Sequence, residues 1–436
     1  MVSIDEVVAL AWGLVNEVAG ELEGGRCGLK EAEERVLRFV HQIGALMIEE
    51  IVERVGEPTR ENTITVDGKL ARYRGQENLR FICRFGSEVV KSRRRYHVEG
   101  EGSYCPLDEK LGVSGCRGFS PLMSYLLALF GGCGPYETAA GQLTTVLGFG
   151  VSATAVERNT EAAGRRLALR PFDLISAKRQ SECCDLLIVE IDGTTSPQIH
   201  EEPGLTGRQS MKQPTEYKEC NVVVIEKRRE SGWTDRWIGG CYGPRAGFDE
   251  YVRQAGIRMG QLQAAAVVFL ADGAHHNWEI QMNNFPGSVG ILDFYHASQH
   301  LAAFCALLKS EPTRKPTYER LRGMLYDGEI VQLIEQMRTA LGRVSDRSEA
   351  VKELCYFRTN RHRMHYDEYR ERGYPIGSGL VEGSCKFVVG KRFKGNGMRW
   401  KRPDNEAVLK VRLAVLNETL QKEFSLKKTR EIHYAA

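Results

Sequence analysis

The sequence has no apolar stretch that approaches the roughly 20 residues a membrane-spanning helix requires. It also has no C-x-x-C pair: its 12 cysteines are scattered, and only Cys183 and Cys184 are adjacent. Residues 1–20 include acidic Asp5 and Glu17 but no basic residue, which excludes a typical secretory signal peptide. We therefore expect a cytoplasmic protein whose cysteines are small buried hydrophobic residues rather than disulfides.

The chain also has little net charge, +3 over 436 residues. The distribution of the charge is more informative than its sum. Residues 358–402 contain twelve Lys and Arg against four Asp and Glu, and a second basic run, Lys427-Lys428-Thr429-Arg430, lies near the C-terminus. Such a local excess suits a phosphate backbone, but it also suits a solvated helix face, and charge alone leaves both readings open.

The length allows two to four domains. Residues 1–70 form the first expected region, which is helical because its apolar residues recur every three or four positions. Two stripes carry this pattern: Val7, Leu10, Ala11, Leu14 and Val18 in the first, and Val36, Phe39, Val40, Ile43, Met47 and Ile51 in the second. Both stripes are interpreted as core or dimer packing.

The next two regions differ in pattern. Residues 71–118 read as a small β-rich region, with short strands around 72–74, 79–83 and 94–98. Residues 119–165 read as a helix-turn-helix region, in which Ser152 caps a helix that carries Arg158. Two helices around a glycine-containing turn fit DNA binding, and they equally fit any αα-hairpin.

From residue 183 the pattern becomes α/β. Residues 186–191, 222–225, 236–238, 265–270 and 289–292 are expected strands, with a helix over 249–259 between the third and fourth. We predict a mixed five-stranded sheet with helices, divided into residues 183–300 and 358–417. An all-α insertion, 301–357, separates the two parts, and 418–436 is a basic C-terminal tail.

Three carboxylates are placed where this α/β pattern would build a site. Asp192 and Asp272 each follow a buried strand and precede a glycine, which allows a sharp turn that exposes the carboxylate. Glu382 follows Pro375-Ile376-Gly377-Ser378-Gly379, so that Ser378 would cap a helix carrying Glu382 in its first or second turn. Their order along the chain is the one expected of an RNase H-like core.

Three carboxylates can hold two hard cations, one for the attacking and one for the leaving oxygen of a phosphodiester. Mg²⁺, or Mn²⁺, suits an all-oxygen ligand set. The basic residues that follow Glu382 could neutralise a nucleic-acid backbone: Lys386, Lys391, Arg392 and Lys394.

Each carboxylate also has a simpler interpretation. An Asp-Gly pair after a strand is often only a turn, and Glu382 could merely pair with Lys386 on the next helical turn. The joint order of all three residues is what favours the catalytic interpretation.

Several motifs give the chain a family resemblance. It resembles the ISKra-type insertion-sequence transposases of bacteria and, more distantly, the Mutator-like superfamily. The resemblance covers about Tyr104 to Asn417 and rests on these segments: Cys105–Gly112, Val189–Gly193, Ala271–Ala274, Ile291–His296, Arg361–Met364, Pro375–Glu382 and Gly397–Trp400.

The resemblance implies that Asp192, Asp272 and Glu382 form a DDE metal-binding triad with two ions. It implies that Asp293-x-x-His296 is a signature between the second and third carboxylates, and that 301–357 is the insertion that splits the core. His296 would contact DNA or brace the site, although a helix-packing role is as plausible; Arg399 and Trp400 belong to a typical segment. Relatives have paired cysteines like a zinc ribbon, whereas Cys83, Cys105 and Cys116 form no pair, which argues against structural zinc.

The sequence thus predicts a DDE transposase that cleaves and joins DNA at the terminal inverted repeats of its own insertion sequence, acting as a dimer or higher oligomer. Two alternatives stay open. One is an RNase H-like nuclease without strand transfer, and the other is a domesticated DNA-binding protein without catalysis.

Overall fold

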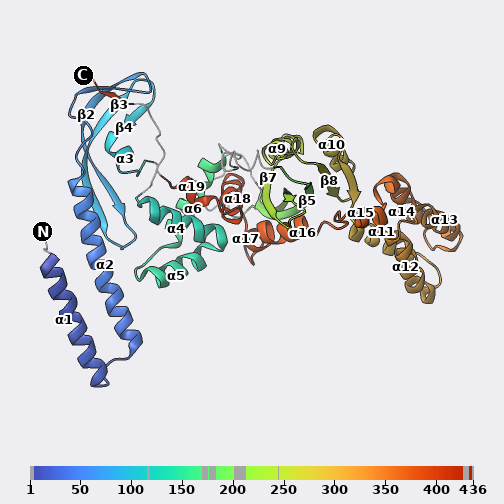
Figure 1. Cartoon of the computed structure of the whole chain (residues 1–436), viewed down its shortest axis with the longest axis horizontal. Coiled ribbons are helices and arrows are strands. Elements are labelled where there is room, and N and C mark those ends of the chain that lie inside the picture. Colours follow the sequence, from blue (N-terminus) through green and yellow to red (C-terminus); the bar gives the residue numbers. More distant parts are fainter. Residues whose placement is uncertain are drawn as a thin grey trace. The chain divides into compact units, whose positions relative to one another are not determined.

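The structure, a computed structural model, describes residues 4–114, 118–168, 175, 183–200, 213–243, 245–425 and 432–434. The chain forms two compact units (Figure 1). The first comprises residues 1–163 and 418–436, and the second comprises residues 164–417. Among the described helices, none combines the length and the apolar character that crossing a bilayer would take.

The first unit begins with the predicted helices, α1 (Ile4–Glu23) and α2 (Leu29–Arg54). A five-stranded antiparallel sheet in the order β10-β1-β2-β3-β4 follows. Its strands are β1 (Thr63–Val66), β2 (Lys69–Ile82), β3 (Glu88–Val98), β4 (Gly102–Tyr104) and β10 (Ile432–Tyr434). Two of these strands correct the predicted boundaries. Residues 63–70, expected in the helical region, belong to this sheet, and so does part of the expected tail.

Cys83 and Cys105 directly follow β2 and β4 of this sheet. Cys83 and Cys105 are both buried, and the Cys105 thiol donates to Glu77 Oε1 at 3.5 Å. Burial raises the pKa of Cys105 to about 12. Cys116 lies outside the described residues.

Four helices follow the sheet in the chain. They are α3 (Pro106–Lys110), α4 (Pro121–Cys133), α5 (Tyr136–Leu147) and α6 (Ala153–Ala168). The predicted cap of α6 is present, because Ser152 Oγ accepts from Ala155 N at 3.1 Å. Gly148 ends α5 in the left-handed conformation with φ of 72°, where glycine carries no steric penalty. The short helix α19 (Leu420–Glu423) packs on α4.

The second unit is built on a five-stranded mixed sheet in the order β7-β6-β5-β8-β9. Its strands are β5 (Leu186–Ile199), β6 (Thr215–Arg228), β7 (Thr234–Tyr242), β8 (Ala266–Ala271) and β9 (Val289–Leu292). The first three are antiparallel neighbours, whereas β8 and β9 run parallel to β5. All five strands were predicted, although β5 and β6 are much longer than expected.

Helices cover both faces of this sheet. On one face, α9 (Arg245–Arg258) and α10 (His275–Asn284) complete a core with residues such as Leu187, Val189 and Ile191. Segments late in the chain cover the other face: α16 (Gly379–Cys385), the π-helix η3 (Lys386–Gly390), α17 (Lys391–Phe393) and α18 (Arg402–Leu416). Because both faces are covered, Leu187–Ile191 of β5 are all buried, and all of them except Glu190 are apolar.

The predicted insertion is helical throughout the described residues. After α11 (Phe294–Ala306) the chain forms α12 (Glu311–Tyr326), α13 (Ile330–Ala340) and α14 (Arg347–Asn360), which pack on one another. Short turns complete this part: η1 (Leu341–Arg343), η2 (Arg361–Arg363) and α15 (Tyr366–Glu371). The chain then returns to the sheet at α16.

Candidate active site

Asp192 lies on β5, and Asp272 directly follows β8, the parallel neighbour of β5. In the register of β5 and β8, Glu190 pairs with Leu270. Each aspartate is two residues further along its own chain, so the two reach the same level of the sheet. Neighbouring strands are about 4.8 Å apart, and the charge of Asp272 acts on Asp192.

The strand β5 does not end at Asp192 as predicted. It continues to Ile199, because its antiparallel partner β6 extends the hydrogen-bonded ladder as far as Thr215. Gly193 therefore lies inside a strand and makes no turn. Its missing side chain instead leaves room for Glu219, whose Oε1 would be 2.7 Å from a Cβ at this position.

Asp192 is held by hydrogen bonds and affected by two other carboxylates. Its Oδ1 accepts from Gly193 N at 2.7 Å, and the Cys385 thiol of α16 donates to its carboxylate. Burial raises the pKa of Asp192, and the charges of Asp272 and Glu382 raise it further. The sheet and α16 thus bring Asp272 and Glu382 each within electrostatic reach of Asp192.

Asp272 is fixed by the residues that follow it. Its Oδ1 accepts from Ala274 N at 3.0 Å and from Asn277 Nδ2 at 2.7 Å. Gly273 makes room for Tyr356 of α14, and a Cβ here would lie 2.2 Å from the tyrosine Cε2. The insertion therefore contributes an aromatic side chain beside Asp272. No local pattern in the sequence predicts this contact, because Tyr356 is 84 positions away from Asp272.

Glu382 lies in the first turn of α16, as predicted. Ser378 is the N-cap residue, but its side chain makes no capping bond. The first turn of α16 is capped by the buried carboxylate of Glu190 instead, whose Oε2 accepts from Val381 N at 2.9 Å. The Glu382 side chain is 62% exposed and forms an ion pair with Lys386 at 2.7 Å.

Two carboxylates that the metal-site reasoning did not use hold the α16 region in place. Glu190 is 1% exposed, and burial raises its pKa to about 7. Its charge within an otherwise apolar strand is a signal that sequence reasoning could have used. Asp293 is 4% exposed and accepts from His296 N and Ser378 N, both at 2.5 Å. It thereby ties the start of α11 to the loop before α16.

Within the described residues, no group of three or more His, Cys, Asp or Glu side chains is arranged to hold a metal ion. The reason is local: Glu382 is turned to Lys386, and Asp272 is held by Asn277. The chemistry of the site nevertheless fits a hard divalent cation. Asp272 and Glu382 each repel Asp192, and the donor atoms of all three residues are oxygen.

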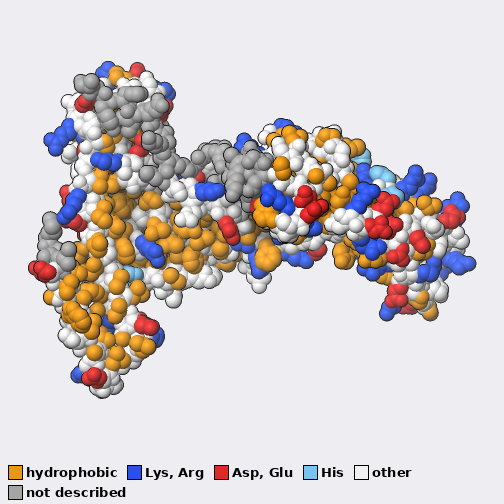
Figure 2. Space-filling view, viewed as in Figure 1, with side chains coloured by type: hydrophobic (Ala, Val, Ile, Leu, Met, Phe, Trp, Pro, Cys, Tyr) orange, Lys and Arg blue, Asp and Glu red, His pale blue; other side chains and the backbone are white. Residues whose placement is uncertain are grey.

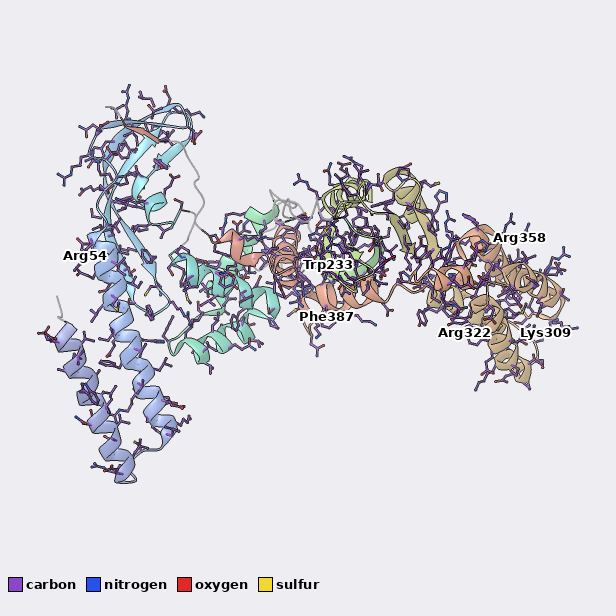
Figure 3. All side chains as sticks on the ribbon, in the orientation of Figure 1. Arg54, Trp233, Lys309, Arg322, Arg358 and Phe387 are labelled. Atoms are coloured by element: carbon purple, nitrogen blue, oxygen red, sulfur yellow. The ribbon has the colours of Figure 1, made fainter. Side chains whose placement is uncertain are left out.

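The surface beyond Glu382 is basic and carries an aromatic ring. Phe387 is 49% exposed, and Lys391 Nζ lies 4.2 Å from its ring centroid. Figure 3 shows Phe387 pointing away from the ribbon next to α16. The sequence reasoning used the lysines but missed this phenylalanine. Exposed Lys394 completes the group and donates to Thr194 Oγ1 at 2.8 Å.

Other predicted site residues are less exposed. Arg392 is fully buried, 4.8 Å from the ring centroid of Trp400, and Trp400 itself is only 8% exposed. Both belong to the packing under the site rather than to a DNA-facing surface. Arg399 Nη1 donates to Gln213 O at 2.9 Å.

The remaining two residues lie on helices. The His296 ring is 5.2 Å from that of His300 on α11, which leaves both its bracing and its packing interpretations open. Arg158 is exposed on α6, in the first unit.

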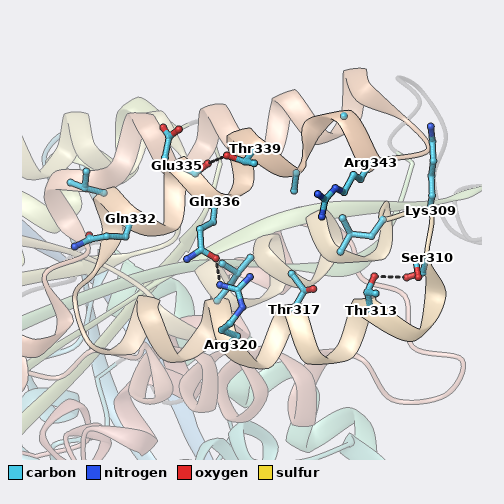
Figure 4. Close-up of a pocket in the computed structure, with 15 residues that line it drawn as sticks. Lys309, Ser310, Thr313, Thr317, Arg320, Gln332, Glu335, Gln336, Thr339 and Arg343 are labelled. Atoms are coloured by element: carbon cyan, nitrogen blue, oxygen red, sulfur yellow. Dashed lines mark hydrogen bonds between the residues drawn. The ribbon is translucent and has the colours of Figure 1, made fainter.

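The helical insertion contains a separate cavity of about 1000 Å³ between α12 and α13 (Figure 4). Arg320 and Gln336 face each other across it and are hydrogen-bonded. The cavity is distinct from the carboxylate site, because its lining contains none of the predicted site residues. It is lined by Leu308, Lys309, Ser310, Thr313, Thr317, Arg320, Leu321, Val331, Gln332, Glu335, Gln336, Thr339, Ala340, Gly342 and Arg343.

Comparisons with known proteins give little beyond this geometry. No family model matches the chain, and no curated protein matches its sequence. Among solved structures, the chain is similar to one titled "Drosophila P element transposase strand transfer complex". The TM-score is 0.28 and the identity 8%, over 70% of this chain and 80% of that one.

Proposed function

We propose that the protein is a DDE transposase of the ISKra type with an RNase H-like core, and that Asp192, Asp272 and Glu382 are its catalytic residues. One observation carries the proposal: the parallel register of β5 and β8 sets the two aspartates side by side, and the charge of Glu382 acts on Asp192. The order β7-β6-β5-β8-β9 supports the core assignment, because it gives the mixed five-stranded sheet that such a core requires.

In this proposal the three carboxylates hold two Mg²⁺ or Mn²⁺ ions. The ions would supply Lewis-acid stabilisation of charge on the phosphate and its two reacting oxygens. To help hold these ions, Glu382 would have to leave its ion pair with Lys386. Exposed ion pairs contribute only about 0–1 kcal/mol, so this exchange costs little.

The protein groups position DNA for in-line displacement. Oxygen from water, or from a 3′-hydroxyl, gives up its proton and forms a bond to phosphorus, while the opposite P–O bond breaks and the displaced oxygen takes up a proton. Lys386, Lys391 and Lys394 neutralise the backbone, and Phe387 offers a surface on which an unpaired base can stack. The helix-turn-helix region with Arg158 binds the terminal inverted repeats.

The test is cleavage of duplex DNA that carries the inverted repeats flanking the coding sequence, with and without Mg²⁺. Asp192→Asn, Asp272→Asn and Glu382→Gln should each lower the cleavage rate at least about 1000-fold, because each removes several kcal/mol of charge stabilisation. Glu335→Gln, an exposed carboxylate on α13, is the matched control and should leave the rate unchanged. Cleavage that persists in the three variants would contradict the proposal.

A second assay separates the alternatives. A pre-cleaved end with a free 3′-hydroxyl should be joined to target DNA by a transposase, whereas a nuclease of the same fold would only hydrolyse. A domesticated DNA-binding protein would bind the ends without either reaction.

A further inference from the structure

The cavity between α12 and α13 is lined by more positive than negative side chains. Its charged residues are three cations, Lys309, Arg320 and Arg343, and one carboxylate, Glu335. That carboxylate is neutralised from outside the cavity, because Glu335 forms an ion pair at 3.0 Å with Arg338, which is not part of the lining. Figure 2 shows both basic and acidic side chains over the helical insertion, so the excess of cations belongs to the cavity rather than to the whole surface.

None of the three cations is neutralised by a carboxylate in the described part of the chain. Arg320 donates to a neutral amide across the cavity, Gln336 Oε1 (Figure 4). The side chains of Lys309 and Arg343 have no hydrogen-bond or ion-pair partner among the described residues. Cations that share one cavity without a counter-charge repel one another, and a bound anion removes this repulsion.

Backbone pairing fixes two of these cations next to each other. Leu308 and Val344 form an antiparallel bridge, and Lys309 N donates to Arg343 O at 2.9 Å. Leu308 and Val344 are each 5% exposed and belong to the core of this unit. Because side chains alternate along extended backbone, the adjacent residues Lys309 and Arg343 turn to the open side, where both are exposed.

The other lining residues add hydroxyl groups and apolar surface. Ser310 and Thr313 lie at the same end of the cavity as Lys309 (Figure 4). Leu321 and Val331 contribute apolar surface. A volume of about 1000 Å³ suits a small molecule, which such sites hold with apolar walls and a few placed polar groups.

The two kinds of lining indicate a ligand with a charged head and an apolar body. A phosphate monoester has three terminal oxygens that accept hydrogen bonds and nearly two negative charges at neutral pH. Several cations can therefore bind it at once, and guanidinium groups match its geometry. A single carboxylate has one charge and two oxygens, which one guanidinium already satisfies. Three cations around one cavity thus favour the phosphate.

We propose that this cavity binds a small phosphate monoester. Lys309, Arg320 and Arg343 bind its phosphate, and Leu321 and Val331 contact an apolar or aromatic body. The inference does not depend on the proposed DNA chemistry, because the cavity shares no residue with the carboxylate site.

The test is saturation-transfer NMR of the full-length chain with 1-naphthyl phosphate, which carries a phosphate on an aromatic body. We expect a Kd on the order of 1 mM or below. The two halves of the probe, 1-naphthol and, as a competitor, inorganic phosphate, should each bind at least about tenfold more weakly. No binding of 1-naphthyl phosphate, or equal binding of either half, would overturn the proposal.

A first variant removes the free charge of one cation without removing its side chain. Gln336→Glu places a carboxylate where Arg320 now meets an amide, so Arg320 gains an internal counter-charge. The Kd of 1-naphthyl phosphate should rise at least about tenfold. The temperature of thermal unfolding should not fall, because ion pairs near the surface are neutral or slightly stabilising. Misfolding would lower it, which separates the two causes.

A second variant has a matched control. Lys309→Ala combined with Arg343→Ala should also raise the Kd at least about tenfold. Lys315→Ala combined with Arg347→Ala removes the same charge from exposed positions of the insertion outside the lining, and should leave the Kd unchanged.

Three results with these variants would overturn the proposal. The probe could bind all of them equally, or the control pair could weaken binding as much as the cavity pair. Duplex DNA of random sequence, at the same phosphate concentration, could displace the probe, which would mean that the cations bind a nucleic-acid backbone.

Discussion

Tyr356 and Gly273 share a small space beside Asp272. The Tyr356 ring stacks on His300 with centroids 3.8 Å apart, and His300 Nδ1 is 2.7 Å from Glu353 Oε2. These contacts hold the Tyr356 ring in place, so it cannot easily move away from Gly273. Burial raises the pKa of Tyr356, and the charges of Asp272, Asp293 and Glu353 raise it further, so its hydroxyl is neutral beside the carboxylates.

Gly273→Ala should therefore destabilise the second unit. The added Cβ would lie 2.2 Å from Tyr356 Cε2 and 2.8 Å from its hydroxyl oxygen, and overpacking of this kind costs about 1–3 kcal/mol. Urea unfolding followed by fluorescence measures the change. Gly323→Ala in α12 is the control, because no atom lies within 4 Å of its Cβ position, and it should stabilise by roughly 0.5–1 kcal/mol. Equal effects of the two substitutions would show that the Tyr356 contact is unimportant.

At the scale of elements, the site depends on how α16 is attached to β5. The helix is short, and a π-helical segment follows it directly. Such segments are rare and concentrate at functional sites. The Glu190 bond to Val381 N fixes the first turn, and the Cys385 thiol contacts Asp192 one turn later. These two contacts set the distance between Glu382 and the aspartates.

Glu190→Ala should detach the start of α16. Val381 N–H would lose its buried acceptor, which costs about 1–3 kcal/mol, and the proposed DNA cleavage should fall because Glu382 is no longer positioned. Glu190→Gln keeps an acceptor oxygen at the same place and should retain most of the stability and activity. Thermal unfolding measures the stability of the two variants, and the cleavage assay measures their activity. Equal losses in both variants would mean that the charge of Glu190, rather than its hydrogen bond, is what matters.

At the scale of the whole molecule, the first strand of the chain and the last described strand pair in one sheet. β10 pairs with β1 in antiparallel register, with Thr65 opposite His433. The last strand in sequence is thus an edge of the first sheet, and it covers backbone groups of β1 that would otherwise be unpaired.

A chain truncated after Ser425 should lose this protection. Amide hydrogens of Thr63–Val66 should exchange faster by hydrogen–deuterium exchange, since their partner strand is gone, while those of β8 in the other unit should not change. Removal of Ala435 and Ala436 alone, which leaves β10 intact, is the control. Unchanged protection of β1 in the truncated chain would contradict the pairing.

Local patterns in the sequence determined most of the elements. Apolar alternation and runs predicted the five strands of the second unit, and three-to-four spacing predicted α1, α2 and the insertion helices. Strand-end aspartates and a glycine-rich turn led to Asp192, Asp272 and Glu382, because these signals lie within a few residues of each side chain. The metal and DNA roles of those residues remain predictions.

Only the tertiary structure decided which contacts form between segments that are far apart in the sequence. The length of β5 depends on its pairing with β6. The cap of α16 comes from Glu190, almost 200 positions away, and a side chain at position 273 would clash with Tyr356. The same holds for β10, whose pairing with β1 joins residues more than 360 positions apart. Such contacts leave no periodic or local trace in a single sequence, since they arise when separate elements pack together.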